Sequence, residues 1–164
     1  CITLGNSWSY VPGNQYKSSR KVIHMLTDII SKNGNLLLNV GPGPDGEWDS
    51  LAYNRLEAIG KWMKINGEAV YESEADPNLP RQGKWAFTRK GTAVYAIYQV
   101  AENEMIENSL SVNLPAGVKV KSVSVIGGPQ KVKFTQNGVQ VVLSTTDKLI
   151  VKQTEALVFK LVTE

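Results

Sequence analysis

The sequence is poor in cysteine, in long apolar runs and in clustered charge. Cys1 is the only cysteine, so an internal disulfide is excluded. No apolar stretch approaches the ~18 residues of a membrane-spanning helix, so we expect no contact with a membrane. The 18 basic and 15 acidic residues give a net charge of only +3, and no lysine or arginine run exceeds two residues. Such a mild and scattered charge does not favour nucleic-acid binding.

The length limits the possible architectures. With 164 residues and 42% apolar composition, the chain can bury a core and hold one domain or two small ones. It is too short for a complete (β/α)₈ barrel, which takes roughly 250 residues. The sequence opens without methionine or a signal peptide, and we expect it to have been cut from something longer.

The first half predicts an α/β unit in the order βαβα. A strand remnant at 1–4 and a loop at 5–16 precede a helix that Ser18 or Ser19 can cap. In that helix, apolar residues at i, i+3, i+4 and i+7 form a buried stripe: Val22, Met25, Leu26, Ile29 and Ile30. A strand at 36–40, apolar on both faces, and a helix at 51–66 follow, which is typical of a parallel sheet with right-handed crossovers.

The loop after the second strand spells G-x-G-x-x-G between Gly41 and Gly46. We do not interpret it as a dinucleotide site, because Pro42 and Pro44 remove backbone N–H donors that a pyrophosphate needs. The acidic residue required about twenty positions later would also fall within the second helix. These glycines and prolines are expected to shape a turn.

The second half has a different pattern, and residues 76–80 mark the change. Beyond them, short strands of period two are predicted at 85–89, 92–99, 110–114, 118–126, 131–135, 139–143 and 157–162. Asn137-Gly138 is the clearest hairpin turn. The segments predict an antiparallel β-sandwich. Four lysines fall on one face of their strands, as a solvated face or as a patch for an anionic ligand: Lys119, Lys121, Lys131 and Lys133.

Four blocks of the first half carry a resemblance to a known family: Ser7-Trp8-Ser9-Tyr10, Asp28 to Pro42, Asp45-Gly46 and Ile59 to Tyr71. Together they resemble the carboxyl-terminal third of a retaining α-L-fucosidase of glycoside hydrolase family 29. The middle block is highly specific, whereas the second half matches only by position. Family members usually have glycine where this chain has Ser9, which affects the expected conformation of that loop.

The resemblance implies a fold of α/β followed by all-β. Residues 1–76 would be the last βα units of a (β/α)₈-like barrel, and residues 77–164 a carboxyl-terminal antiparallel β-sandwich. The remainder of the barrel would come from an upstream segment or a separate chain. The resemblance also implies hydrolysis of terminal α-L-fucose from glycans with retention, in a periplasmic, extracellular or lysosomal compartment. We predict no cofactor and no metal site.

Retaining glycosidases use two carboxyl groups about 5 to 5.5 Å apart. The resemblance implies that the nucleophile lies upstream and that the acid/base precedes the position of Cys1, so we name no catalytic residue in this chain. Glu68 follows a helix end and is expected to face away from the sugar. Asp45, Glu47 and Asp49 lie on a βα loop and are better placed, although Asp45 also suits a turn and Asp49 a helix cap.

The substrate-binding candidates are Trp8, Tyr10, Asn39 and Trp48, which lie on loops or strand ends where α/β folds collect ligand contacts. An aromatic ring can cover the apolar face of a sugar, and an amide can bind its hydroxyl groups. Alternatively, Trp8 packs the mouth of the barrel and Trp48 packs against the helix start.

The remaining aromatic residues and the histidine have structural interpretations. Trp62 and Trp85 are predicted to be core residues. His24 falls on the polar face of its helix, and we expect it to be solvated. Two other classes of function stay open: a non-catalytic carbohydrate-binding or interaction module, and a structural domain without a ligand.

Overall fold

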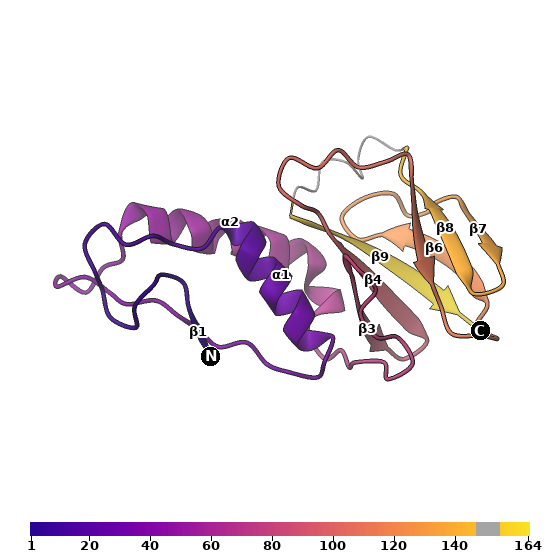
Figure 1. Ribbon diagram of the computed structural model, residues 1–164, viewed down its shortest axis with the longest axis horizontal. Coiled ribbons are helices and arrows are strands. Elements are labelled where there is room, and N and C mark those ends of the chain that lie inside the picture. Colours follow the sequence, from indigo (N-terminus) through magenta and orange to yellow (C-terminus); the bar gives the residue numbers. More distant parts are fainter. Residues whose placement is uncertain (147–154) are drawn as a thin grey trace.

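The computed structural model describes residues 1–146 and 155–164. Figure 1 shows an elongated molecule with the two helices toward one end and a two-sheet β-sandwich at the other. The amino terminus lies in the helical part, and the carboxyl terminus lies at the far end of the sandwich. Within the described ranges, no helix is both long and apolar enough to cross a membrane.

The helical part is the predicted βαβα unit. Its elements are β1 (Ile2–Thr3), α1 (Ser19–Ile30), β2 (Leu38–Asn39), α2 (Ser50–Asn66) and the 3₁₀ turn η1 (Gly67–Ala69). The pairing of β1 with β2 is parallel, as a helical crossover requires. The Ser18 and Asp49 side chains cap the two helices by accepting hydrogen bonds from backbone N–H groups of their first turns.

The second strand is shorter and less buried than its sequence predicts. The apolar run at 36–40 indicated burial on both faces, yet only Leu38–Asn39 form strand β2, and the Leu37 side chain is 66% exposed. Burial of both faces requires cover and neighbouring strands, and among the described residues β2 pairs with β1 alone. The apolar composition of this segment therefore indicates a more buried environment than the described residues provide.

The second half forms the predicted antiparallel sandwich. One sheet has the order β3-β4-β9-β6 and the other β5-β8-β7, and all their pairings are antiparallel. The strands are β3 (Trp85–Lys90), β4 (Ala93–Gln99), β5 (Ser109–Asn113), β6 (Val120–Val125), β7 (Phe134–Asn137), β8 (Gln140–Ser144) and β9 (Ala156–Thr163). The hairpin at Asn137-Gly138 is confirmed, with a positive φ of 58° at the glycine.

One strand of the sandwich begins later in the sequence than predicted. Residues 131–135 were expected to form a strand, but β7 begins only at Phe134. The preceding residues pass from one sheet to the other: the Val132 N–H donates to the Val123 carbonyl of β6 at 2.8 Å, and the Lys133 carbonyl accepts from the Ser144 N–H of β8 at 2.9 Å. Because successive residues pair with different strands, this segment forms no regular strand pair.

The α/β unit and the sandwich share a hydrophobic core. Ile23 of α1 and Trp62 of α2 pack with Tyr95, Ile97 and Val158 on the outer face of the four-stranded sheet. Trp62 also donates its indole N–H to the Ala156 carbonyl at 3.2 Å. The prediction that Trp62 and Trp85 are core residues is confirmed, since they are 5% and 6% exposed.

The same junction corrects the prediction for His24. The side chain is half-buried, and its Nε2 lies 2.8 Å from the Glu155 carbonyl of the sandwich. Beside it, the Gln99 amide donates to the His24 carbonyl and to Thr27 Oγ1. Helical periodicity could not show that the sandwich covers this face of α1, on which Thr27 is fully buried.

Candidate functional site

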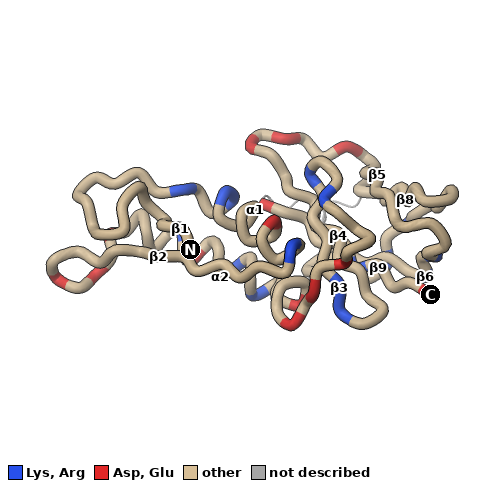
Figure 2. The backbone as a smooth tube through the Cα atoms, turned by 60° about the horizontal axis from the view of Figure 1, so that its bottom comes forward, with Lys and Arg blue, Asp and Glu red and all other residues tan. Residues whose placement is uncertain are grey.

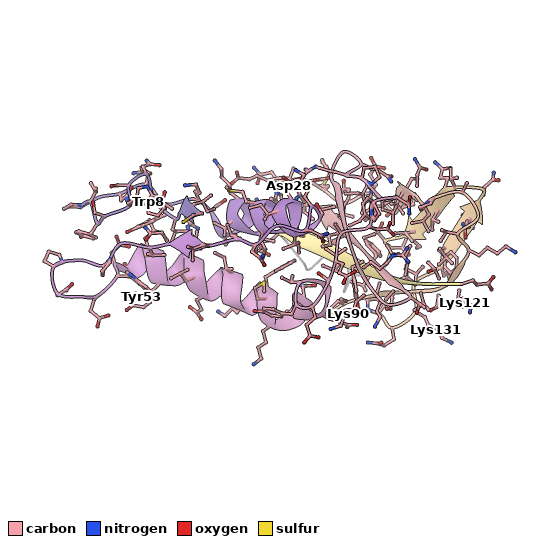
Figure 3. All side chains as sticks on the ribbon, turned by 90° about the horizontal axis from the view of Figure 1, so that it is seen from below. Trp8, Asp28, Tyr53, Lys90, Lys121 and Lys131 are labelled. Atoms are coloured by element: carbon pink, nitrogen blue, oxygen red, sulfur yellow. The ribbon has the colours of Figure 1, made fainter. Side chains whose placement is uncertain are left out.

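Trp8 and Asn39 meet at the carboxyl ends of the two parallel strands. The Asn39 amide Nδ2 donates to the Trp8 carbonyl over 2.9 Å, a contact between residues 31 positions apart. The Trp8 ring itself is 64% exposed. In Figure 3 it lies at the end of the molecule remote from the sandwich. A backbone held by an amide, with a free aromatic face, is a suitable geometry for stacking against a sugar.

Gly41 fixes the position of the Trp8 loop. A Cβ atom at Gly41 would lie 2.5 Å from the Tyr10 backbone nitrogen and 2.7 Å from the Ser9 carbonyl carbon. Only glycine therefore permits the exit of β2 to pack this closely against residues 9–10. The φ angle of Ser9 is not positive, so serine is accommodated at this position without backbone strain.

The loop between β2 and α2 is closed by its own hydrogen bonds. The Gly43 N–H donates to the Glu47 carbonyl at 2.7 Å, and the Gly46 N–H donates to the Gly43 carbonyl at 3.0 Å. The Asp45 carboxylate accepts from the Glu47 N–H, as its turn chemistry predicts. These backbone donors are used internally, which supports the interpretation of the glycine-rich segment as a turn. The half-buried Tyr10 lies beside Gly43.

Trp48 belongs to a separate aromatic pair. Its ring lies 5.5 Å from that of Tyr53, at an interplanar angle of 55°, and its side chain is 37% exposed. The Tyr53 hydroxyl donates to Glu47 Oε2 at 2.6 Å, and this bond raises the pKa of Tyr53. Figure 3 shows Trp8 and Tyr53 at the same end of the molecule but on different sides of it. The structure thus brings Trp8 and Asn39 together, places Tyr10 beside Gly41 and Gly43, and pairs Trp48 with a residue that the sequence did not single out.

Tyr16 is a second residue that the sequence did not assign to the site. Its hydroxyl donates to Asp49 Oδ2 at 2.8 Å, while Asp49 Oδ1 accepts from the Ala52 N–H and caps α2. Burial, together with this bond, raises the pKa of Tyr16 to about 12. The cap function of Asp49 was readable from its place before the helix. The tyrosine, 33 residues away, carried no local signal.

Lys17 ties the same loop to the first strand. Its ammonium donates to the Thr3 carbonyl at 2.7 Å and to the Gly5 carbonyl at 3.1 Å. Thr3 is the last residue of β1, and Gly5 lies in the loop that leads from it to Trp8. The lysine therefore stabilises the loop that presents the candidate ring.

Glu68 lies on η1, at the opposite end of α2 from the candidate residues. It accepts hydrogen bonds from the Tyr95 hydroxyl at 2.8 Å and from the Lys160 ammonium. Lys160, with Tyr95, lowers the pKa of the Glu68 carboxyl. An ionised carboxylate engaged with the sandwich has the properties of a structural link between the two halves.

A parallel βαβα unit, with aromatic and amide side chains at its strand ends and an antiparallel sandwich packed against it, places this chain in the class of α/β proteins that carry an additional β-sandwich. A family model described as Alpha-L-fucosidase matches residues 1–68. The rat tissue α-L-fucosidase is 32% identical over 149 residues, which is 87% of this chain and 31% of the relative. The human tissue α-L-fucosidase is 37% identical over 102 residues, 56% of this chain and 21% of the relative.

Solved structures give the same assignment. The α-L-fucosidase isoenzyme 1 from Paenibacillus thiaminolyticus superposes with a TM-score of 0.86 at 26% identity, over 100% of this chain and 39% of that one. The Thermotoga maritima α-fucosidase in complex with fucose gives a TM-score of 0.81 at 26% identity, over 98% and 39% of the two chains. This chain therefore belongs to the α-L-fucosidase family, as the resemblance predicted. It spans about a third of the length of the curated relatives it matches.

Proposed function

We propose that this chain is part of a retaining α-L-fucosidase that removes terminal α-L-fucose from glycans. Family membership supports the reaction class. One structural observation supports a role for the candidate residues in sugar binding. Asn39 bonds to the Trp8 carbonyl, and the exposed Trp8 ring lies at the carboxyl ends of β1 and β2. Trp8, Tyr10 and Asn39 would line one side of the sugar site, and Trp48 would contact a more distant part of the glycan.

We further propose that residues 1–76 contribute the last βα units of a (β/α)₈-like barrel and that residues 77–164 form the sandwich domain. The parallel β1–β2 pair and the exposed Leu37 support this division, because a barrel would supply the missing neighbours of β2. The remainder of the barrel, on an upstream segment or a separate chain, is then the principal protein partner of this surface.

The catalytic carboxylates are proposed to belong to that remainder. The acids on the loop before α2 already have structural partners: Asp45 closes a turn, Glu47 accepts from Tyr53, and Asp49 caps the helix. A retaining mechanism requires one carboxylate free to attack and another able to hold a proton. Neither role is compatible with these contacts as they stand.

We propose a compartment outside the cytoplasm: periplasmic or extracellular, or lysosomal in a eukaryote. This proposal is supported by the family resemblance and by similarity to the human plasma α-L-fucosidase, at 36% identity over 60% of this chain. Recovery of the native protein from the culture medium or periplasmic fraction would support this location, and recovery only with cytoplasmic markers would contradict it.

The proposed activity is tested on the complete protein and on this chain in parallel. With an aryl α-L-fucoside, the complete protein should release fucose whose first-formed anomer, followed by NMR, retains the α configuration. The 164-residue chain alone should release none, because positioning groups cannot replace a missing nucleophile. Turnover by the pure chain, abolished by replacing one of its own acids, would contradict the placement of the carboxylates.

A further inference from the structure

The sandwich contains a long stretch without acidic residues. From Asn108 to Thr146 there is no aspartate or glutamate, while four lysines occur there: Lys119, Lys121, Lys131 and Lys133. This stretch supplies β5, β6, β7 and β8, and Figure 2 shows the tube of β8 without acidic positions. We call the four lysines the lysine edge. The net charge of the whole chain is small, but the charged side chains of residues 108–146 are all positive.

The lysine edge extends from one sheet to the other. Strand β6, which carries Lys121, is an outer strand of its sheet. Lys131 precedes Val132, whose N–H donates to the Val123 carbonyl of β6, and Lys133 lies beside β8, where its carbonyl accepts from the Ser144 N–H at 2.9 Å. Figure 3 shows Lys121 and Lys131 near one another at the end of the molecule opposite Trp8. A ligand bound to this edge would leave the proposed sugar site free.

Within the described ranges, these lysines differ from five others that have an acidic partner. Elsewhere, ion pairs join Lys32 to Asp28, Lys61 to Glu57, Lys84 to Glu104, Lys90 to Glu72 and Lys160 to Glu68. All four lysines of the edge are exposed, and none forms an ion pair with a residue in the described ranges. Glu164 lies beside Lys119, where the Glu164 N–H donates to the Lys119 carbonyl.

The neighbouring sheet adds uncharged hydrogen-bonding groups. Its outward positions are mainly hydroxyl and amide side chains: Ser109, Ser111, Asn113, Thr135, Asn137, Gln140 and Ser144. A shallow hollow of about 220 Å³ joins this face to the edge and is lined in part by Lys133, Phe134 and Thr135. Ammonium groups next to hydroxyls and amides match a ligand that carries both anions and hydroxyls.

We propose that the lysine edge binds an anionic polysaccharide, meaning a glycan chain that bears sulfate or carboxylate groups. A membrane surface would favour exposed apolar anchors, yet Val139 is the one large hydrophobic residue exposed within 108–146. Single-stranded nucleic acid would favour aromatic rings and arginine, and the stretch contains Phe134 alone and no arginine. The proposal does not depend on the fucosidase reaction, because it concerns binding at the other end of the molecule.

The test measures binding by the full chain with heparin as the sulfated probe, polygalacturonate as the carboxylated probe and dextran as the neutral one. Wild-type protein should bind both anionic polymers, more weakly as salt rises, and should not bind dextran. Replacing Lys121, Lys131 and Lys133 together by Gln should weaken binding to the anionic polymers by roughly tenfold or more.

A matched control removes the same charge elsewhere. Lys61, Lys64 and Lys90 replaced by Gln lower the net charge equally, by three, and this variant should bind within about twofold of wild type. The Arg versions of Lys121, Lys131 and Lys133 should retain binding. Equal loss of affinity in the Gln variant and its matched control would mean that net charge alone is responsible, and the proposal would be wrong.

A measurement on wild-type protein removes dependence on any variant. Heparin should slow chemical acetylation of Lys121, Lys131 and Lys133 while leaving that of Lys61, Lys64 and Lys90 unchanged. Vesicles containing phosphatidylserine and a single-stranded oligonucleotide serve as competitors at equal charge concentration. If either displaces heparin as well as heparin displaces itself, or if acetylation is slowed uniformly, the assignment to a polysaccharide is overturned.

Discussion

At the scale of single residues, Trp8 and Asn39 are held together by one hydrogen bond with little burial around them. In the complete enzyme, Trp8→Ala and Asn39→Ala should each lower kcat/KM by roughly tenfold or more. Trp8→Ala removes the ring proposed to stack on the sugar. Asn39→Ala removes both the bond that positions the Trp8 loop and a hydrogen-bonding partner for a sugar hydroxyl. Steady-state kinetics on an aryl α-L-fucoside, with melting temperatures measured in parallel, check this.

Trp85 provides the control for that pair. It is buried, donates to the Ser111 carbonyl at 2.9 Å, and has Tyr98 4.9 Å and Phe159 5.9 Å from its ring centre. Trp85→Ala should cost about 3–5 kcal/mol of stability and leave the kinetics of the folded fraction unchanged. If the Trp8 and Asn39 variants instead melt early with unchanged kcat/KM, both residues are structural.

His24 gives a second prediction at this scale, concerning pH. Burial lowers the pKa of His24 below its usual value, and the neutral ring donates Nε2–H to the Glu155 carbonyl. Arg20, Arg81 and Glu104 are the charged groups that act on it. The unfolded chain then binds the proton more readily, so stability should fall as pH drops below the unfolded value of about 6.5.

Urea denaturation at pH 7.5 and pH 5.5 measures this effect. Wild type should lose more stability across that interval than His24→Gln, which cannot titrate there. Carboxyl groups whose pKa is lowered, such as that of Asp28, become protonated only at more acidic pH. They therefore do not contribute to the difference in stability between pH 7.5 and pH 5.5. Parallel losses in the two proteins would contradict the assignment to His24.

At the scale of elements, two glycines with opposite surroundings test how the strand end positions the loop. Gly41→Ala would place a methyl group 2.5 Å from the Tyr10 backbone nitrogen, so it should destabilise by about 1–3 kcal/mol and displace the Trp8 loop. Gly60→Ala, within α2 and with nothing within 4 Å, should stabilise by about 0.5–1 kcal/mol.

Thermal or denaturant unfolding of both variants measures the difference. Trp8 fluorescence is not separable from the other tryptophans by intensity alone, so loop displacement is followed by NMR of a Trp8 indole resonance assigned by substitution. Equal stability of the Gly41→Ala and Gly60→Ala variants would show that the loop is not held by the close approach at Gly41.

The elements also show what sequence could and could not predict. Local rules narrowed the first cap to Ser18 or Ser19, gave Asp49 cap chemistry and predicted the Asn137-Gly138 turn, because each depends on neighbours within a few residues. The bonds from Tyr16 to Asp49 and from His24 to Glu155 join residues 33 and 131 positions apart. Periodicity carries no information about such contacts, so the site was predictable as strand ends and only partly as a set of partners.

At the scale of the whole molecule, the two halves differ in the size of their own hydrophobic cores. The sandwich surrounds an extensive cluster that includes Phe87, Leu143 and Phe159, all with no exposed surface. Among the described residues, the cluster between the α/β elements has three fully buried members, Leu4, Val22 and Ala52. The contacts of α1 and α2 with the outer sheet therefore supply much of the stability of the helices, whereas β1 and β2 lie beyond that support.

The last prediction follows from this asymmetry. In the 164-residue chain, protease should cut within residues 1–75 well before it cuts within residues 81–164, because β2 has one partner strand and Leu37 is 66% exposed. Limited proteolysis with mass spectrometry should yield a persistent sandwich fragment, with first cuts in the loops at 5–16 and 41–48. Joining the chain to the rest of its barrel should slow those first cuts, since neighbouring strands would cover β2. Equal resistance of the two halves in the isolated chain would mean that the α/β unit is stable without a barrel.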